Sequence, residues 1–357
     1  MTMAYFSENF ITWLDAHADQ IDKESGDLAD QLLERIAAEG VFGIAVPEIY
    51  GGQGGSKTEV VEFLSELARH SLTASFISWG HRTFIETLLA SSNDVLKKSW
   101  LPDLLTGKLA AGTALSNATK YLSKIEELNV TLAEQDGKYY LRGRLPWVTN
   151  LRSDRFAAVF AAQFEDSSKE PIVLAIPSGA AGLSRSADLE FAALQGSNTA
   201  ALSFDNVLLD DSWILSDDAK SFLAQTRPEF LGYQFGLAFG LAERSLDEVA
   251  QSLSSNRSVL KQEYDETKDK LTAVRQSLFK GLEAEEVFID NPRQLFQLRI
   301  DIVDIVAASL LLELQASGGR GYLKGSASGF IRRWNEGAFL PIVSPSAVQL
   351  RHILETV

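Results

Sequence analysis

The feature that most constrains this chain is a change of hydrophobic periodicity that occurs twice along the sequence. In the first third, apolar residues recur three and four positions apart, as amphipathic helices require. From about Leu109 to Asp211 the pattern becomes short alternating runs separated by Asp-Gly and Pro-Ser-Gly signals, which predicts an antiparallel β unit. Helical spacing returns after Trp213. The chain is therefore expected to enclose a β unit between two helical regions.

This order predicts an α+β multidomain protein. We expect an N-terminal α-helical domain over residues 1–108, a middle antiparallel β domain over 109–212, and a C-terminal four-helix bundle over 213–357. One bundle helix is expected to run from Phe230 to Leu253, because its apolar spacing is continuous. The glycine-dense segment 43–56 reads as a loop, and its Ser-Lys order is the reverse of that in a phosphate-binding loop.

Composition excludes several kinds of site. The 357 residues include no cysteine, which rules out disulfides, iron–sulfur clusters and a cysteine nucleophile. The four histidines lie far apart and none has ligand spacing, so no metal site is expected. A net charge of -15 argues against binding to nucleic acid or to anionic membranes. Without a long apolar run or a basic leader, a cytoplasmic protein is expected.

A tryptophan and a threonine close the longest strand-like run of the middle third. Trp147 and Thr149 lie one residue apart, so a strand end can present an indole face and a hydroxyl to one flat aromatic ligand. A buried strand tryptophan beside a threonine of high strand propensity would explain the same residues. The neighbouring motifs decide between these interpretations.

Five segments, taken in order, resemble the acyl-CoA dehydrogenase family of flavoproteins across nearly the whole chain. Each has an ordinary explanation alone, such as a glycine turn or a helix stop, but their common order is specific. The segments are V-P-E-I-Y-G-G-Q-G-G at 46–55, L-P-D-L-L-T-G at 101–107, G-R-L-P-W-V-T-N at 143–150, S-N-T to F-D-N-V within 197–207, and Q-A-S-G-G-R-G-Y at 315–322.

The resemblance implies a flavin, with FAD expected and FMN possible. It implies that Trp147 packs beside the isoalloxazine ring and that Thr149 hydrogen-bonds the ring. Ser116 is implied as a further hydroxyl or backbone donor, although a turn serine would explain it equally well. Donors at these positions would favour the electron-rich reduced ring.

The same resemblance implies that a neighbouring subunit helps to bind the cofactor. Gln315, Gly318 and Gly319 match the segment that contacts pyrophosphate and adenosine from the partner, so a homodimer or homotetramer is expected. A helix stop would also account for the glycines. Arg257 lies one place from the family's phosphate-binding arginine, and the Phe-Gly that follows it there is absent, which is why FMN stays open. Ser346 is the remaining candidate cofactor-binding residue.

The catalytic base departs from the family pattern. Desaturation of an acyl thioester needs a carboxylate that removes the α-proton while hydride goes to the flavin. Ser344 stands where most members carry that glutamate. Glu229 lies near the alternative position of some relatives and is the candidate catalytic residue, although an acid favoured by the helix dipole would explain it. A CoA thioester substrate and an electron-transfer protein or flavin reductase as partner are implied.

Two alternatives stay open. A two-component flavin monooxygenase, which uses reduced FMN or FAD and oxygen, shares this architecture and has no such base, and the Gly-Ser-rich segment 195–199 has some of its character. A catalytically degenerate member could serve as a binding protein. The loop that lines the acyl-CoA channel in relatives is replaced by residues 117–124, so the resemblance does not transfer substrate identity.

Overall fold

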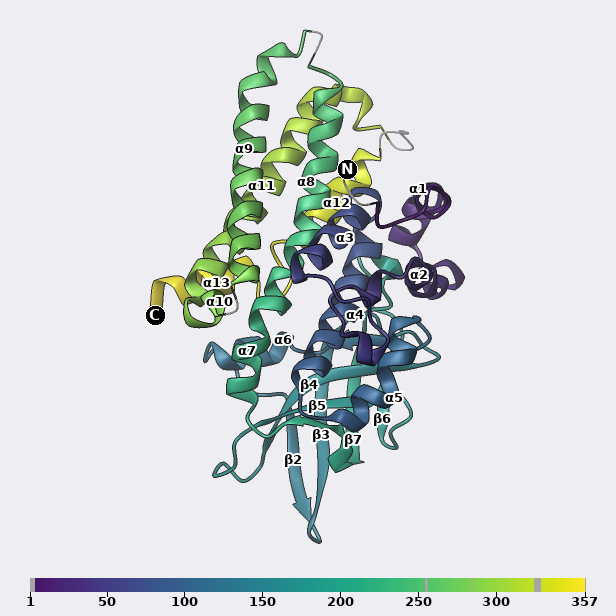
Figure 1. Ribbon diagram of the computed structural model, residues 1–357, viewed down its shortest axis with the longest axis vertical. Helices are drawn as coiled ribbons and strands as arrows, with labels where there is room; N and C mark the ends of the chain where they lie inside the picture. Colours follow the sequence, from purple (N-terminus) through teal and green to yellow (C-terminus); the bar gives the residue numbers. More distant parts are fainter. Residues whose placement is uncertain (1–3, 254–255, 285, 324–328, 357) are drawn as a thin grey trace.

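The computed structural model describes residues 4–253, 256–284, 286–323 and 329–356. A twisted sheet lies at one end of the molecule and long helices extend from it to the other, with the N-terminal helices packed alongside (Figure 1). The order is helical domain, sheet and helical bundle, as the periodicity predicted.

The N-terminal domain consists of helices arranged around one that is buried on nearly all sides. Ser56 accepts the amide of Glu59 while the Glu59 carboxylate accepts the amide of Ser56, and this capping box begins α3. The central helix, α4, is apolar nearly all round, which explains its burial. The helices are α1 (Glu8–Lys23), α2 (Asp27–Ala38), α3 (Lys57–His70), α4 (Leu72–Ala90) and α5 (Asp94–Leu105).

The middle domain is one sheet with the strand order β6-β7-β3-β2-β4-β5-β8, and β1 pairs with β4. A short helix, α6 (Ser116–Leu122), follows the first strand. The strands are β1 (Ala110–Thr113), β2 (Val130–Gln135), β3 (Lys138–Val148), β4 (Phe156–Phe164), β5 (Ile172–Pro177), β6 (Leu183–Arg185), β7 (Ala200–Leu208) and β8 (Ile214–Ser216).

The sheet is mixed, which corrects the expected antiparallel β unit. Strand β4 pairs in parallel with both β1 and β2, and the other pairs are antiparallel. Alternation of apolar and polar residues has the same period in both directions, so it could not reveal the parallel pairs.

The bundle helices follow the predicted stripes, with one break. The helix expected over Phe230–Leu253 is interrupted at Tyr233, so that α7 ends at Gly232 and α8 begins at Gln234. Gly232 lies against Leu282, where an added Cβ would come within 2.9 Å of a side-chain methyl. The elements are α7 (Ala219–Gly232), α8 (Gln234–Ala250), α9 (Lys261–Glu283), α10 (Val287–Asp290), α11 (Pro292–Ser317), α12 (Phe330–Phe339) and α13 (Ala347–Thr356).

Candidate functional site

A cavity of about 570 Å³ lies where all three domains meet. This volume is within the usual range for small-molecule and cofactor sites. Its walls come from α4, the sheet, α6, α7 and the segment from α12 to α13. The lining residues are Phe76, Trp79, Thr113, Ser116, Lys120, Trp147, Thr149, Phe191, Ala192, Ala193, Leu194, Thr199, Phe230, Asn335, Ala338, Phe339, Ile342, Val343, Ser344, Ser346 and Gln349.

One wall combines an aromatic surface with a row of hydroxyls. The indole of Trp147 is 57% exposed and stacks on Phe191, with the ring centroids 6.5 Å apart. The hydroxyls of Thr149 and Thr199 are 2.6 Å apart, and Ser197 continues the row at 2.8 Å. A hydroxyl both donates and accepts, so this row can turn one proton towards a ligand atom. An exposed indole beside buried hydroxyls suits a flat ligand with polar edge atoms.

The segment after α12 forms another wall and is fixed by buried hydrogen bonds. The hydroxyls of Ser344 and Ser116 are 2.7 Å apart, and the Ser344 carbonyl accepts from the Gln234 side chain at 2.8 Å. Arg299 donates to the Gln234 side-chain oxygen and to the Leu340 carbonyl. Burial lowers the pKa of the Arg299 guanidinium to about 10. Among the described residues Arg299 has no carboxylate partner, so its charge is balanced only by dipoles behind this wall.

The structure brings four of the proposed cofactor-binding residues to this cavity. Ser116, Trp147, Thr149 and Ser346 all line it. The Ser346 hydroxyl accepts the amide of Gln349 at 3.2 Å and so also caps the first turn of α13. These four residues come from β3, α6 and the bundle, which are far apart in sequence.

The other four cofactor candidates lie elsewhere. Arg257, Gln315, Gly318 and Gly319 are not among the residues that line the cavity. Arg257 and Gly318 do meet each other, because a Cβ added to Gly318 would lie 3.4 Å from the Arg257 guanidinium. Gly319 has open space where a side chain would be. A cation and exposed glycine backbone thus gather at the end of α11, apart from the cavity of their own chain.

Glu229 is not brought to the cavity either, although its neighbour Phe230 lines it. The Glu229 carboxylate forms an ion pair with Lys57 of α3. On the same side, Glu86 accepts from the Tyr233 hydroxyl at 2.9 Å and pairs with Arg82 at 3.0 Å. Burial, and then the charge of Glu86, hold the pKa of Glu229 above its ordinary value. The geometry therefore gives no support to Glu229 as the base and places it in a charged cluster between helices.

Replacing Glu229 by glutamine tests this placement. We expect the melting temperature to change by no more than about 2 °C, because the loss of the ion pair with Lys57 and the removal of a buried charge oppose each other. We expect substrate-dependent bleaching of bound flavin to stay within about tenfold. Stopped-flow absorbance and thermal denaturation measure the two effects, with Lys57→Met as the matched control. A loss of about 100-fold or more in bleaching at unchanged stability would instead assign the base to Glu229.

Within the part of the chain that the structure describes, no acid and no histidine lines the cavity, and Lys120 is the one charged side chain in the lining. His81 is fully buried: its Nδ1 accepts the Ala111 amide at 3.2 Å, so the Nε2 proton is donated to the Leu104 carbonyl at 2.8 Å. Burial lowers the pKa of His81 to about 4, so the ring is neutral.

Sequence reasoning missed this lysine and the aromatic side chains that α4 contributes to the lining. The apolar residues of α4, Phe76 and Trp79 among them, continue nearly all round the helix, and such a pattern marks burial without showing which side meets a cavity. Lys120 lies within the segment that replaces the family's loop, where the resemblance gave no residue to compare.

A buried acid also supports the cavity wall from outside. Asp22 accepts the amide of Leu194, a lining residue, at 2.7 Å. Burial and the nearby Glu336 carboxylate raise the pKa of Asp22 to about 7, with Asp19 acting in the same direction and Arg332 opposing it. The folded protein thus keeps a proton on Asp22 that the unfolded chain releases near pH 4.

Because of this raised pKa, we expect the contribution of Asp22 to the free energy of unfolding to fall as the pH rises from about 4 to about 7, and then to level off. Asp22→Asn keeps an acceptor for the Leu194 amide and removes the titration. Its melting temperature is expected to exceed that of the wild type by a margin that grows between pH 5 and pH 8. Asp19→Asn, at an exposed position, is the control. A margin that does not change with pH would contradict the assignment.

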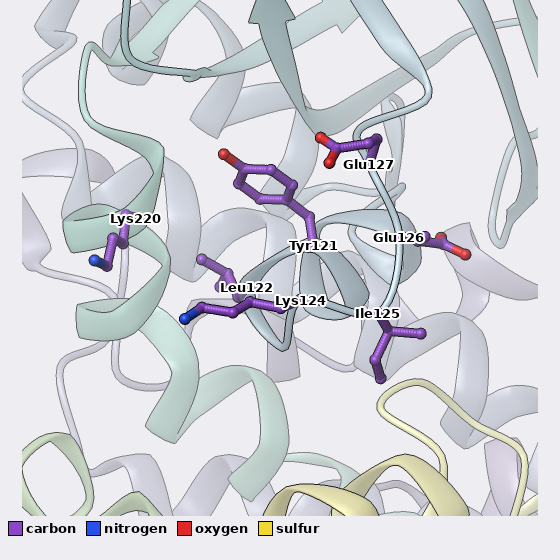
Figure 2. A pocket seen from close by; sticks show the side chains of 7 residues that line it. All are labelled: Tyr121, Leu122, Lys124, Ile125, Glu126, Glu127 and Lys220. Carbon is purple, nitrogen blue, oxygen red and sulfur yellow. The ribbon is translucent and has the colours of Figure 1, made fainter. Parts of the chain in front are cut away.

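A second, more open hollow of about 440 Å³ lies beside α6 and is formed largely by the segment 121–127 and Lys220 (Figure 2). Lys124 extends towards the helix that carries Lys220, and Glu126 and Glu127 lie on the other side of the hollow (Figure 2). The mixed charge gives this hollow no clear preference for an anion or a cation.

Comparison with known proteins agrees with the resemblance. Residues 5–108 match the acyl-CoA dehydrogenase N-terminal domain family. An acyl-CoA dehydrogenase of Bacillus subtilis (strain 168) is 23% identical over 322 residues, which cover 87% of this chain and 85% of the relative. A 3-(aryl)acrylate reductase of Clostridium sporogenes (strain ATCC 15579) is 25% identical over 240 residues, 66% of this chain and 63% of the relative. The structure of butyryl-CoA dehydrogenase from Megasphaera elsdenii superposes with a TM-score of 0.80 at 16% identity, covering 99% of both chains. The predicted fold class is therefore confirmed.

The helices that the structure describes include none with the length and apolar character of a membrane span.

Proposed function

We propose that this relative of the acyl-CoA dehydrogenases is a flavin-dependent oxidoreductase that acts on an acyl-thioester-like substrate. The observation that carries the proposal is the cavity between sheet and bundle, where the exposed indole of Trp147 adjoins the buried hydroxyl of Thr149. The names of the relatives, acyl-CoA dehydrogenase and butyryl-CoA dehydrogenase, support this class of reaction.

The residues of the cavity fit an isoalloxazine ring. Trp147 and Phe191 would pack against the flat ring, while Thr149 and Ser116 would hydrogen-bond its polar edge. When bound, the flavin would supply the redox chemistry by accepting a hydride from the substrate. The protein contributes position and hydrogen-bond donors.

FAD is the proposed form of the flavin, with its phosphates held by a second copy of the chain. Arg257 and the glycines Gly318 and Gly319 gather away from the cavity of their own chain, where a cation and close backbone approach suit an anion. Gln315 is exposed on the same end of α11. On this proposal the protein is a homodimer or a dimer of dimers, and an electron-transfer protein re-oxidises it.

The second candidate is a flavin-dependent monooxygenase supplied with reduced flavin by a partner reductase. One observation favours it: no aspartate, glutamate or histidine is among the described residues that line the cavity, and the Ser344 hydroxyl is already hydrogen-bonded to Ser116. A neutral hydroxyl pair does not remove the α-proton of a thioester unaided.

Anaerobic mixing distinguishes the two candidates. Bleaching of bound flavin by any member of an acyl-CoA panel supports the dehydrogenase, because only that reaction reduces flavin with a thioester. Absence of bleaching across the panel, together with substrate oxygenation when reduced flavin and oxygen are supplied, supports the monooxygenase.

Flavin binding itself is tested first by reconstitution. Purified protein incubated with FAD or FMN is expected to acquire a flavin spectrum and a higher melting temperature. Thr149→Val removes a hydroxyl at nearly constant volume and should weaken flavin binding by about 3- to 10-fold, the usual value of one hydrogen bond. Thr272→Val, on the exposed face of α9, should leave it unchanged. If neither flavin changes the spectrum or the melting curve, the proposed function fails.

A further inference from the structure

The apolar end of the cavity is walled by four aromatic side chains from three helices. Phe76 and Trp79 of α4 stack with centroids 5.7 Å apart and planes 9° from parallel. Phe339 of α12 meets the edge of Phe76 at 4.8 Å, and Phe230 of α7 meets Trp79 at 5.4 Å. All four line the cavity, and we call them the aromatic wall.

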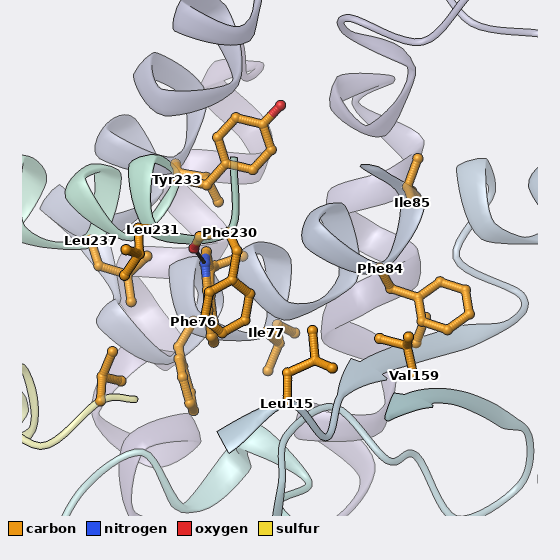
Figure 3. Packing of buried hydrophobic residues seen from close by; sticks show 14 of the residues in the cluster. Phe76, Ile77, Phe84, Ile85, Leu115, Val159, Phe230, Leu231, Tyr233 and Leu237 are labelled. Atoms are coloured by element: carbon orange, nitrogen blue, oxygen red, sulfur yellow. Dashed lines mark hydrogen bonds between the residues drawn. The ribbon is translucent and has the colours of Figure 1, made fainter. Parts of the chain in front are cut away.

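The aromatic wall is held in place from behind. The indole nitrogen of Trp79 donates to the Phe230 carbonyl at 3.1 Å, so its polar atom is satisfied inside the protein. Phe76 and Phe230 belong to the same packed cluster as Leu115 and Ile77 (Figure 3). Rings fixed in this way present flat carbon surfaces to a ligand, and because they cannot move aside they leave no room for a long alkyl chain.

Polar groups gather at the α6 and α13 side of the same cavity. The hydrogen-bonded hydroxyls of Ser116 and Ser344 leave one hydrogen for a ligand, and Lys120 supplies the positive charge. The side-chain amide of Gln349 donates instead to the Thr119 carbonyl and the Ser123 hydroxyl. The Lys120 ammonium lies 3.3 Å from the Glu126 carboxylate, and the two side chains are 37% and 34% exposed. A partly exposed pair of this kind is weak, so an anion that enters the cavity can compete for the lysine.

We propose that the site is selective for aryl-substituted short-chain acyl groups, whose ring packs on the aromatic wall and whose carboxyl or thioester carbonyl meets Ser344 and Lys120. This inference rests on the proposed function, because it names the substrate class of the same site. The ring contributes aromatic contacts that a saturated chain of equal size does not make. The lysine favours the free acid over a neutral ester, because only the free acid carries a charge.

Equilibrium binding to the flavin-loaded protein tests the proposal with simple probes. We compare 3-phenylpropionate with nonanoate, which has the same number of carbons, and with 3-cyclohexylpropionate, which has a similar shape but no aromatic ring. Calorimetry is expected to show 3-phenylpropionate binding about tenfold more tightly than either. Equal or tighter binding of nonanoate overturns the proposal. Binding that disappears when flavin is loaded also overturns it, because the acid would then occupy the flavin position.

Two variants test which residues contact the ring of the ligand and which contact its carboxylate. Phe230→Leu should reduce the preference for the aryl acid by about 3- to 10-fold, the usual value of one aromatic contact, with little change for nonanoate. Lys120→Met should weaken the free acid by about tenfold and leave the methyl ester unchanged. Lys124→Met, in the neighbouring hollow, is the matched control and should change neither. A Phe230→Leu variant that keeps the full aryl preference contradicts the aromatic wall as its source.

Two further measurements show whether the substrate is a free acid or a CoA thioester, and whether a negative result counts against the proposed function or against the aryl preference. If the CoA thioester of 3-phenylpropionate binds more tightly than the free acid, the substrate is the thioester; the reverse order assigns the free acid. Selective aryl binding without any flavin binding would defeat the proposed function and leave the aryl site standing. Flavin binding without aryl preference would defeat this inference alone.

Discussion

Replacing Ser344 by glutamate is expected to increase the rate at which acyl thioesters bleach the bound flavin by about 100-fold or more. Ser344 lines the cavity beside Ser116, and the lining contributed by residues 4–253, 256–284, 286–323 and 329–356 contains no acid. A carboxylate at this position would supply the general base, which is usually worth about 10²- to 10⁴-fold. The buried Arg299 guanidinium, linked to Ser344 through Gln234, would favour the charged form of the new side chain. Stopped-flow absorbance under anaerobic conditions measures the gain.

Ser344→Gln is the matched control, because glutamine has the same size and hydrogen-bonding reach but cannot take a proton at neutral pH. The gain should appear only in Ser344→Glu and should grow with pH as the carboxyl ionises, which a purely structural effect would not do. A glutamate variant no faster than the glutamine variant would show that the cavity does not place the α-carbon beside residue 344. That result would favour the monooxygenase.

The contrast between Ser344 and Glu229 shows which residues of the site could be predicted from the sequence. Four of the residues that line the cavity were proposed from the resemblance, and two of them lie within one motif: Trp147 and Thr149, with Ser116 and Ser346. Glu229 was chosen by its place along the chain. One step along a helix turns a side chain by about 100°, so a difference of one residue in the alignment decides whether a carboxylate faces a cavity or a helix interface.

The fold was predictable to the extent that periodicity records burial. Helix stripes and strand alternation gave the three regions in the right order. Strand direction leaves no such mark, so the parallel pairing of β4 was missed. The aromatic wall was missed because Phe76, Trp79, Phe230 and Phe339 are distant in sequence and meet only after three helices have packed.

The contact between helices α3 and α8 accounts for the largest stability effect that we expect. Helix α8 crosses α3 so closely that a Cβ added to Gly240 would lie 2.0 Å from the Ser65 carbonyl oxygen and 2.7 Å from the Ala68 methyl. Ser65 contributes backbone there, which cannot rotate away. Gly236 makes a similar contact one turn earlier on α8, 2.8 Å from the Val61 carbonyl oxygen. The N-terminal domain and the bundle therefore approach each other through glycine.

Gly240→Ala is expected to destabilise the protein by about 2–4 kcal/mol and lower its melting temperature by roughly 3–5 °C. Helix propensity alone predicts the opposite sign, because alanine is favoured over glycine by about 1 kcal/mol in a helix. Gly337→Ala is the matched control: it is also buried in a helix, but its new methyl would meet the Leu310 side chain, which can move. Thermal and denaturant unfolding should therefore show the larger loss in Gly240→Ala. A stabilised Gly240→Ala variant would mean that α3 and α8 are further apart than their glycine contact requires.

Because the cavity lies between the domains that this contact joins, the Gly240→Ala variant should also bind flavin more weakly than Gly337→Ala does.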